Sequence, residues 1–179
     1  AVMSVIEEIE GKKTAVFMKT FNQINDNFRK LFGYIFPGEG FLALDSPHAP
    51  FDSGLQIKVR DEKNEKYLES MSGGEKTLTA LAFLFAIQKF RPAPFYVLDE
   101  IDMFLDGVNA EIVSRMLKRR AEHSQFITVS LRKIALKEAN YLYGVTMHDS
   151  GISEMIGNID PDSVGPKGEI RTITQEVLP

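Results

Sequence analysis

The chain has 179 residues, of which 44% are hydrophobic, and it carries a formal net charge of -4 at pH 7. This length suits one domain or one lobe of a domain, and the acidic balance argues against a strongly basic nucleic-acid surface. The absence of cysteine excludes disulfides and thiolate metal sites, and the three histidines are too scattered to be metal ligands together. No signal peptide or membrane-length apolar run is visible, so a cytoplasmic chain is expected.

The first 35 residues show the apolar period of a helix. Intervals of three and four residues separate Phe17, Phe21, Ile24, Phe28, Leu31 and Ile35. A similar stripe continues upstream across Gly11, at Val2, Ile6 and Ile9. The part before Gly11 is too short to form a stable coiled coil by itself. We therefore predict a helix over residues 14–33 that packs on the domain, with one ordinary amphipathic helix as the alternative interpretation of the whole stripe.

The apolar period changes to two between Pro37 and Tyr67. Residues 41–44 and 55–59 are typical of strands, and the loop between them contains proline and glycine. We predict that these strands form a small antiparallel layer on one edge of the main sheet.

A glycine turn then opens a helix. Ser72 is a good N-cap residue, and Glu75 lies three residues later, so the pattern S-G-G-E fits a capping box. Gly73 and Gly74 let backbone approach a ligand closely, and the free N–H groups of a helix N-terminus favour an anion. The alternative is a well-capped helix and nothing more. The following residues, 75–90, are nearly all apolar and predict a buried core helix that holds Ser72 rigidly.

A short apolar strand follows, at residues 95–98, after Pro92 and Pro94. Such a run suits a parallel strand covered on both faces. Asp99 and Glu100 come at its carboxyl end, where open α/β sheets bind ligands. Asp99 is placed to bind Mg²⁺, and Glu100 to accept a proton from an attacking water or to orient it. The alternative is a solvated acidic turn.

The remaining chain alternates helix and strand. We predict a helix over 108–120, a strand over 125–129, a helix over 134–139 and strands over 141–147 and 152–156. This order indicates a mainly parallel sheet with helices around it. Basic residues cluster in this region, where they form a solvated helix face or a DNA contact: Lys118, Arg119, Arg120, Lys133 and Lys137. Residues 159–179 are rich in proline and glycine and receive no function, although 169–174 alternates weakly like an edge strand.

Several of these motifs resemble one family. Residues 71–76, M-S-G-G-E-K, resemble the ABC-ATPase signature in the form used by SMC (structural maintenance of chromosomes) proteins. Residues 95–100 resemble the Walker B strand, and Leu105-Asp106 resembles the D-loop. The tetrad D-E-I-D at 99–102, with F-A-I-Q at 85–88 and P-A-P-F-Y at 92–96, favours chromosome-organising SMC proteins over repair relatives. The similarity extends from about Phe17 to about Met155.

The resemblance implies the C-terminal half of an SMC head, archaeal or bacterial in style. The expected fold is an α/β, ABC-ATPase-type C-terminal lobe with a mainly parallel sheet and a small antiparallel edge layer. Residues 1–12 would end the coiled-coil arm, 13–158 would form the lobe, and 159–179 would be a tail. The phosphate-binding pattern G-x-x-x-x-G-K-[ST] occurs nowhere in the 179 residues. In the family it belongs to the N-terminal half, and two heads sandwich two ATP molecules.

The resemblance also implies roles for single residues. Asp99 would hold Mg²⁺ and Glu100 would be the catalytic base for the ATP of their own head. The ATP of the partner head would meet the glycine turn, and Asp106 would cross the dimer interface near the attacking water. The expected ATP-binding residues are Ser72, Gly73, Gly74, Glu75, Asp106 and Ser130. Many ABC ATPases have a switch histidine where Leu131 stands, so Ser130 is the nearest polar candidate; a strand-end hydroxyl that satisfies the backbone is the alternative.

Three functions remain open at this stage. The first is an ATPase half-site in chromosome condensation and segregation, inactive without the N-terminal half. Its expected partners are that half, a second head, a kleisin subunit and DNA, with no membrane, in the cytoplasm at the nucleoid. The second is the same scaffold in DNA repair. The third is a kleisin-docking module without activity of its own.

Overall fold

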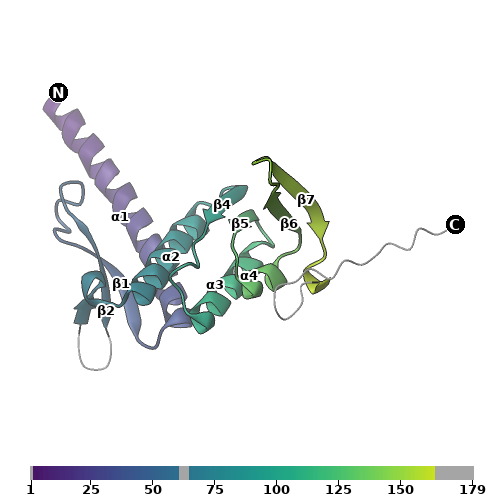
Figure 1. The fold of residues 1–179 in the computed structure, drawn as a ribbon. Helices are drawn as coiled ribbons and strands as arrows, with labels where there is room; N and C mark the ends of the chain where they lie inside the picture. The colour runs from purple at the N-terminus through teal and green to yellow at the C-terminus, as the bar shows by residue number, and fades with distance from the viewer. Residues whose placement is uncertain (1, 61–64, 164–179) are drawn as a thin grey trace. The chain divides into compact units, whose positions relative to one another are not determined.

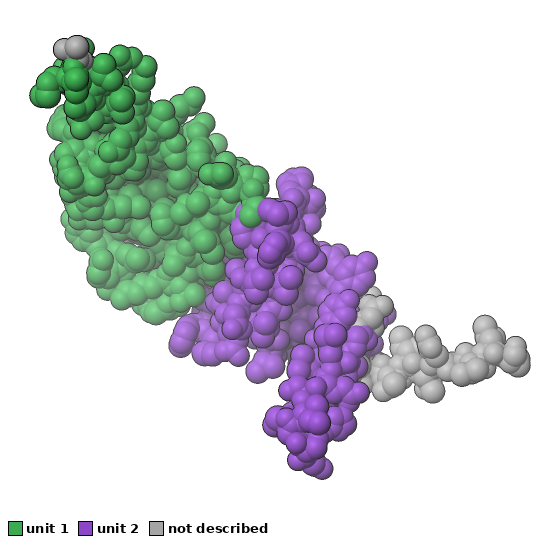
Figure 2. All heavy atoms as spheres, turned by 90° about the horizontal axis from the view of Figure 1, so that it is seen from above, with its two compact units in different colours: residues 1–93 green, residues 94–179 purple. Residues whose placement is uncertain are grey.

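The computed structural model of the chain describes residues 2–60 and 65–163. These residues fall into two compact units, residues 1–93 and 94–179, which are coloured separately in Figure 2. No helix in the described ranges is long and apolar enough to cross a membrane. The predicted boundaries after residues 12 and 158 stay predictions.

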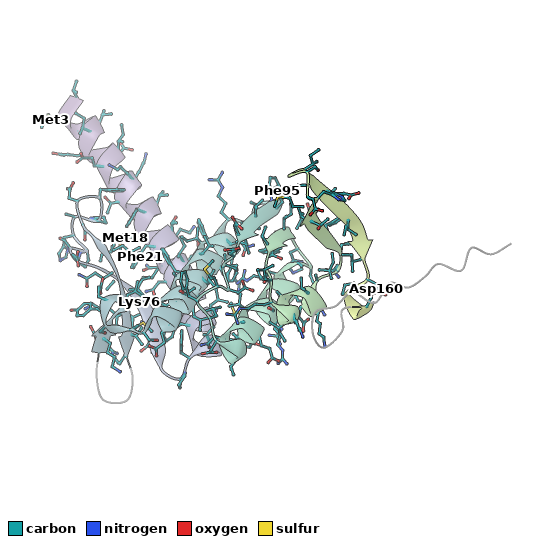
Figure 3. The ribbon with its side chains drawn as sticks, viewed as in Figure 1. Met3, Met18, Phe21, Lys76, Phe95 and Asp160 are labelled. Carbon is teal, nitrogen blue, oxygen red and sulfur yellow. The ribbon has the colours of Figure 1, made fainter. Side chains whose placement is uncertain are left out.

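The first unit begins with one long helix, α1 (Val2–Ile35), which runs through Gly11 without interruption (Figure 1). Its two ends differ in burial. Phe28 and Phe32 are fully buried, whereas the apolar side chains of the first turns, such as Ile9 at 59%, are exposed. Figure 3 shows Met3 on these exposed first turns of α1. The C-terminal part of α1 is therefore the part that belongs to the core, as its period predicted.

Three antiparallel strands form the sheet of this unit, in the order β1 (Glu39–Leu44), β2 (Leu55–Arg60) and β3 (Glu65–Tyr67). The two predicted strands and their antiparallel pairing are confirmed. The short, exposed β3 was missed because its three residues carry no apolar alternation. In the described residues no strand of this sheet pairs with β4 or β5, and its predicted position on the edge of a main sheet stays a prediction.

The core of the first unit lies between α1, β1, β2 and α2 (Gly73–Phe90). Its fully or nearly fully buried members are Phe28, Phe32, Leu42, Val59, Ala82 and Ala86. Asn25 ties α1 to β1, because its side chain accepts from the Leu42 N–H at 2.8 Å and donates to the Leu42 carbonyl at 3.4 Å. The prediction that α2 is buried all round is wrong on one side, where Leu84, Ile87 and Phe90 are exposed.

Gly40→Ala should destabilise this core. A Cβ at Gly40 would lie 2.3 Å from Cγ of the buried Phe32 ring, closer than any normal contact. Such overpacking costs about 1–3 kcal/mol. A Cβ at Gly33, in the helix α1, meets nothing within 4 Å, so Gly33→Ala should instead stabilise by about 0.5–1 kcal/mol. Urea unfolding of both variants checks the pair, and equal effects would contradict the close approach at Gly40.

The second unit contains the predicted alternation of strands and helices. Its elements are β4 (Phe95–Asp99), α3 (Gly107–Arg120), β5 (Gln125–Val129), α4 (Lys133–Glu138), β6 (Leu142–Met147), β7 (Ser153–Ile159) and the 3-10 turn η2 (Pro161–Ser163). β4 and β5 pair in parallel, and β6 and β7 form an antiparallel hairpin. The predicted strand at 152–156 is confirmed as part of β7. The weak strand pattern at 169–174 lies outside the described residues.

The predicted mainly parallel sheet is not shown in the described residues. β4 and β5 are the one parallel pair in the described residues, and the other pairings are antiparallel. The physical reason is that a parallel sheet needs several strands with crossovers, and here β5 is followed by a strand, β6, that pairs with β7 instead. The overall class, a mixed α and β fold, is confirmed.

One face of the β4–β5 pair is open. The register places Phe95, Val97, Ile127 and Val129 on this face, and they are 56%, 61%, 47% and 51% exposed, respectively. On the opposite face Leu98 is buried, and Tyr96 stacks on the Phe126 ring at 5.2 Å. Within the described residues β4 is therefore covered on one face, and cover of the other face stays a prediction. Parallel strands normally have both faces covered by other elements. In the described residues, no element covers the apolar side chains of this face.

Candidate functional site

The glycine turn, Ser72–Glu75, has the geometry that its sequence predicts. Ser72 is the N-cap of α2, and the capping box is complete. The Ser72 Oγ accepts from the Glu75 N–H at 3.4 Å, and a Glu75 carboxylate oxygen accepts from the Ser72 N–H at 2.8 Å. Reciprocal hydrogen bonds therefore hold both residues in the turn.

The electrostatics of the turn follow from the same hydrogen bonds. The Ser72 backbone N–H, and then its hydroxyl, hold the pKa of the Glu75 carboxyl below its ordinary value. A lowered pKa means that the cap stabilises the fold above the ordinary pKa of glutamate and is lost as the pH falls through the lowered value. A Cβ at Gly73 would meet nothing within 4 Å, so the surface beside the turn is open to a ligand.

The two predicted carboxylates lie at the carboxyl end of β4. Asp99 ends the strand, opposite Val129 of β5, and its side chain is exposed. Glu100 follows immediately, and its N–H donates to the Val129 carbonyl at 3.0 Å. The parallel register thus brings Asp99, Glu100 and the first residue after β5, Ser130, to the same end of the strand pair.

Glu100 has an unusual backbone. Its φ is 46°, in the left-handed region, and in the described part of the chain no other non-glycine residue has a positive φ. A side chain with a Cβ adopts this region at a cost, and such residues concentrate at functional sites. The conformation redirects the chain directly at the predicted base. Sequence reasoning missed it, because no glycine or asparagine signals a left-handed residue here.

Asp106 is the N-cap of α3. One carboxylate oxygen accepts from the Asn109 N–H at 2.9 Å and the other from the Asn109 side-chain amide at 2.9 Å. These bonds orient the carboxylate, and each oxygen keeps capacity to accept from a further donor. The side chain is exposed at the start of its helix.

Ser130 is already engaged. Its Oγ donates to Asp102 Oδ2 at 2.5 Å and accepts from the Arg132 N–H at 3.0 Å. A hydroxyl has one proton, so Ser130 would have to leave Asp102 before it donated to a phosphate. The geometry therefore favours the alternative stated for this residue, a strand-end hydroxyl that satisfies its neighbours. Leu131 beside it is 92% exposed and has no hydrogen-bonding group.

Magnesium chemistry can be assessed from the donor groups. Within residues 2–60 and 65–163, no three acidic or histidine side chains gather as a protein-only metal site would require. Mg²⁺ usually keeps several waters and takes one or two carboxylates together with substrate phosphates. Asp99 fits the role of one such carboxylate. The residues present therefore fit a magnesium ion shared with a nucleotide and do not fit a resident metal.

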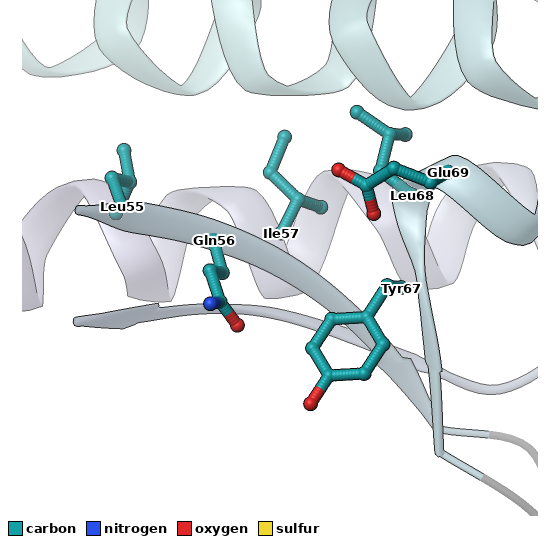
Figure 4. A pocket seen from close by; sticks show the side chains of 6 residues that line it. All are labelled: Leu55, Gln56, Ile57, Tyr67, Leu68 and Glu69. Atoms are coloured by element: carbon teal, nitrogen blue, oxygen red, sulfur yellow. The ribbon is translucent and has the colours of Figure 1, made fainter. Parts of the chain in front are cut away.

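A cavity elsewhere in the first unit contains none of the predicted site residues. It has a volume of about 380 Å³ and lies beside β2 and η1 (Leu68–Ser70) (Figure 4). Its lining is mixed: Leu55, Gln56, Ile57, Tyr67, Leu68 and Glu69. The lining holds no cation for a phosphate, so this cavity does not fit a nucleotide's triphosphate.

The basic cluster is partly occupied in local contacts. Lys118 Nζ lies 2.7 Å from a Glu138 carboxylate oxygen, which ties α3 to α4. Burial lowers the pKa of the Arg120 guanidinium. At least part of the predicted basic surface therefore serves the fold, and DNA contact by these residues stays a prediction.

Comparison with known proteins places this arrangement in a family. Residues 12–154 match the family described as RecF/RecN/SMC N terminal domain. The chain belongs to the RecF/RecN/SMC family. The family description names an N-terminal domain, whereas the motifs predicted the C-terminal half of a head.

Relatives within the RecF/RecN/SMC family agree on the SMC branch. The chain is 46% identical over 158 residues to a chromosome partition protein Smc of Pyrococcus furiosus, covering 87% of this chain and 13% of the relative. It is 44% identical over 153 residues to the Smc of Gloeobacter violaceus, covering 85% of this chain and again 13% of the relative. The chain thus spans about an eighth of these relatives.

Solved structures share the fold. The Smc head domain of Pyrococcus furiosus with an extended coiled coil, bound to the C-terminal domain of ScpA, is 45% identical with a TM-score of 0.79, covering 87% of this chain and 39% of that one. A chain from work on ATP-driven dimerization and DNA-stimulated activation of SMC ATPases is 44% identical with a TM-score of 0.74, covering 80% of this chain and 88% of that one. The present fold is therefore similar to that of SMC head domains.

Proposed function

We propose that this chain is the C-terminal half of an SMC head, which completes a composite ATP site when heads dimerise. One observation carries the proposal: the chain holds a capped glycine turn and a carboxylate pair at a strand end, but no phosphate-binding loop in its 179 residues. A nucleotide needs such a loop or an equivalent cradle of N–H groups for its phosphates. The missing part must therefore come from another segment, which we assign to the N-terminal half.

The open face of the β4–β5 pair supports this assignment. Four apolar side chains on that face are about half exposed. Burying them against further strands or helices of the N-terminal half would give the parallel pair the cover that such sheets normally have. Our assignment of the chain to the C-terminal half of the head rests on these residues. The matched family description names the N-terminal domain.

In this proposal each motif has one task. Asp99 binds Mg²⁺ on the ATP of its own head, and Glu100 takes the proton of the attacking water. The ATP of the partner head binds to the glycine turn, through the Ser72 hydroxyl and the Gly74 N–H, and Asp106 approaches the same water across the interface. The magnesium ion would neutralise phosphate charge. We further propose a role in chromosome partition and DNA organisation, at the nucleoid in the cytoplasm.

A second candidate is a docking module for a kleisin. A related Smc head is bound to the C-terminal domain of ScpA. In this chain one face of the β6–β7 hairpin is apolar and exposed, at Tyr143, Val145, Met147 and Met155. The two candidates are compatible, because docking and ATP hydrolysis would use different residues.

ATP turnover by the chain, alone and mixed with the matching N-terminal half, tests the composite site. We expect turnover only in the mixture, because neither half alone has both a phosphate loop and the carboxylates. Phosphate release is the measurement. Turnover by the chain alone would contradict the need for a second segment. No turnover in the mixture, even with kleisin and DNA added, would favour the docking module.

A further inference from the structure

Two loops meet at the carboxyl end of the β4–β5 pair. The carboxylate loop, Glu100–Asp106, contains both the predicted base and the predicted interface carboxylate. The β5 loop, Ser130–Arg132, leaves the neighbouring strand. Because the strands are parallel and in register from Phe95↔Gln125 to Asp99↔Val129, both loops begin at the same level. Side-chain hydrogen bonds connect them.

The first connection is a buried carboxylate. Asp102 is 7% exposed, and its Oδ2 accepts from the Ser130 hydroxyl at 2.5 Å. The Arg132 N–H in turn donates to the same hydroxyl oxygen at 3.0 Å. A buried charged group needs such partners, because leaving it unpaired is costly. These hydrogen bonds therefore tie Asp102, which lies two residues after Glu100, to the β5 loop.

The second connection is the Arg132 side chain. Its Nη2 donates to the Leu105 carbonyl at 2.5 Å and to the Met103 carbonyl at 3.3 Å. A guanidinium remains charged at all relevant pH values and presents several donors in one plane, so it can bridge two carbonyls. These carbonyls flank Phe104, which is 75% exposed. Packing therefore does little to hold the tip of the carboxylate loop, although the buried Leu105 anchors its end.

The strained backbone lies directly before these contacts. Glu100 has a φ of 46°, and its carbonyl accepts from the Met103 N–H at 3.1 Å. A strained backbone conformation persists only where several contacts from the surrounding structure hold it in place. Here the loop is held at both ends by strands and helices and in its middle by Asp102 and Arg132.

We propose that Asp102, Ser130 and Arg132 form a clamp that positions Glu100 and Asp106 for hydrolysis, with Arg132 as its central positioning residue. The inference rests on the proposed function of the carboxylates. Arg132 acts through the loop backbone and does not touch the nucleotide. Its loss therefore leaves the carboxylates present but wrongly placed, and a displacement of about 1 Å can cost about 100-fold in rate.

Turnover by the complex with the N-terminal half gives the first test. We expect Arg132→Ala to lower kcat about 10- to 100-fold while KM for ATP changes less than about twofold, because no ATP contact is lost. Arg132→Lys should recover part of kcat, since it can still donate to one carbonyl. In a Glu100→Gln background Arg132→Ala should have little further effect, as expected for residues that act through one another. A wild-type kcat in Arg132→Ala, or a change in KM alone, would overturn the proposal.

Arg115→Ala is the matched control. Arg115 lies in α3 of the same unit, is exposed, and ion-pairs with Glu111 one helical turn away. It should keep wild-type kcat. An equal loss in both variants would mean that removing any arginine from this unit lowers the rate, and would overturn the specific role of Arg132.

Amide hydrogen exchange on the full chain separates failure of the clamp from failure of the proposed function. The Met103 and Leu105 N–H groups donate within the carboxylate loop, to the carbonyls of Glu100 and Asp102, each at 3.1 Å. Both amides should exchange faster in Arg132→Ala than in wild type or Arg115→Ala. Unchanged exchange would overturn the clamp whatever the turnover. Faster exchange, with no turnover from the wild-type complex, would retain the clamp and reject the ATPase function.

Discussion

Glu100→Gln should lower ATP turnover by the assembled head about 10²- to 10⁴-fold, the range that a general base contributes. Glutamine has the shape of glutamate but its amide cannot take a proton from water. The Glu100 side chain is exposed at the strand end, and none of the described residues hydrogen-bonds to its carboxylate, so little stability should be lost. ATP binding should remain, and ATP-bound dimers should accumulate. Phosphate release under single-turnover conditions measures the effect.

Glu122→Gln provides the control for this substitution. Glu122 is an exposed glutamate in the turn after α3, so the same change of charge occurs in the same unit away from the strand end. It should keep wild-type turnover. Unchanged turnover in Glu100→Gln would reject Glu100 as the base. A parallel loss of ATP binding would show that the carboxylate contributes to binding and that the rate effect is indirect.

Much of the local structure could be predicted from the sequence, because its signals are local. The capping box needs only Ser72 and Glu75, three residues apart, and it is complete in the structure. Pro92 and Pro94 correctly mark the start of β4, since proline cannot continue the preceding helix. Such signals work within one turn or one strand, and the helices and strands they predict are present.

Pairing and cover could not be predicted in the same way. The apolar run at residues 95–98 indicated a strand with two covered faces, and the structure leaves Phe95 and Val97 exposed. A pattern of residues reports what a strand requires, but it does not report whether the covering layer is in the same segment of chain. The mainly parallel sheet could not be established from the sequence for the same reason, because the number of parallel strands depends on elements distant in sequence.

In the candidate site, too, local features were predictable from the sequence and long-range contacts were not. The types of residue and their places at the ends of elements were predictable for Asp99, Glu100 and Asp106. The positive φ of Glu100 was not, since glutamate carries no signal for the left-handed region. Nor was the hydrogen bond between Asp102 and Ser130, which joins residues 28 apart and depends on the parallel register.

Ser72→Arg should abolish ATP-dependent dimerisation while each head still binds its own ATP. Ser72 is exposed beside an open surface, so a long cationic side chain fits the single chain without a clash. In a dimer it would occupy the space that the partner's ATP requires. The substitution also removes the serine cap, which costs about 1 kcal/mol, equivalent to a Tm shift of about 2–4 °C in a domain of this size. Sedimentation with ATP, in the Glu100→Gln background, measures dimerisation.

Ser72→Thr separates the effect of bulk and charge from the loss of the cap. Threonine keeps a hydroxyl that can both cap α2 and donate to a phosphate, so dimers should form as in wild type. Nucleotide binding by the single Ser72→Arg head, compared with wild type, shows whether its own site is intact. If Ser72→Arg heads still dimerise on ATP, the glycine turn does not face the partner's nucleotide. Its complete capping box would then be a structural feature of α2, and Asp106 would be left as the residue to test at the interface.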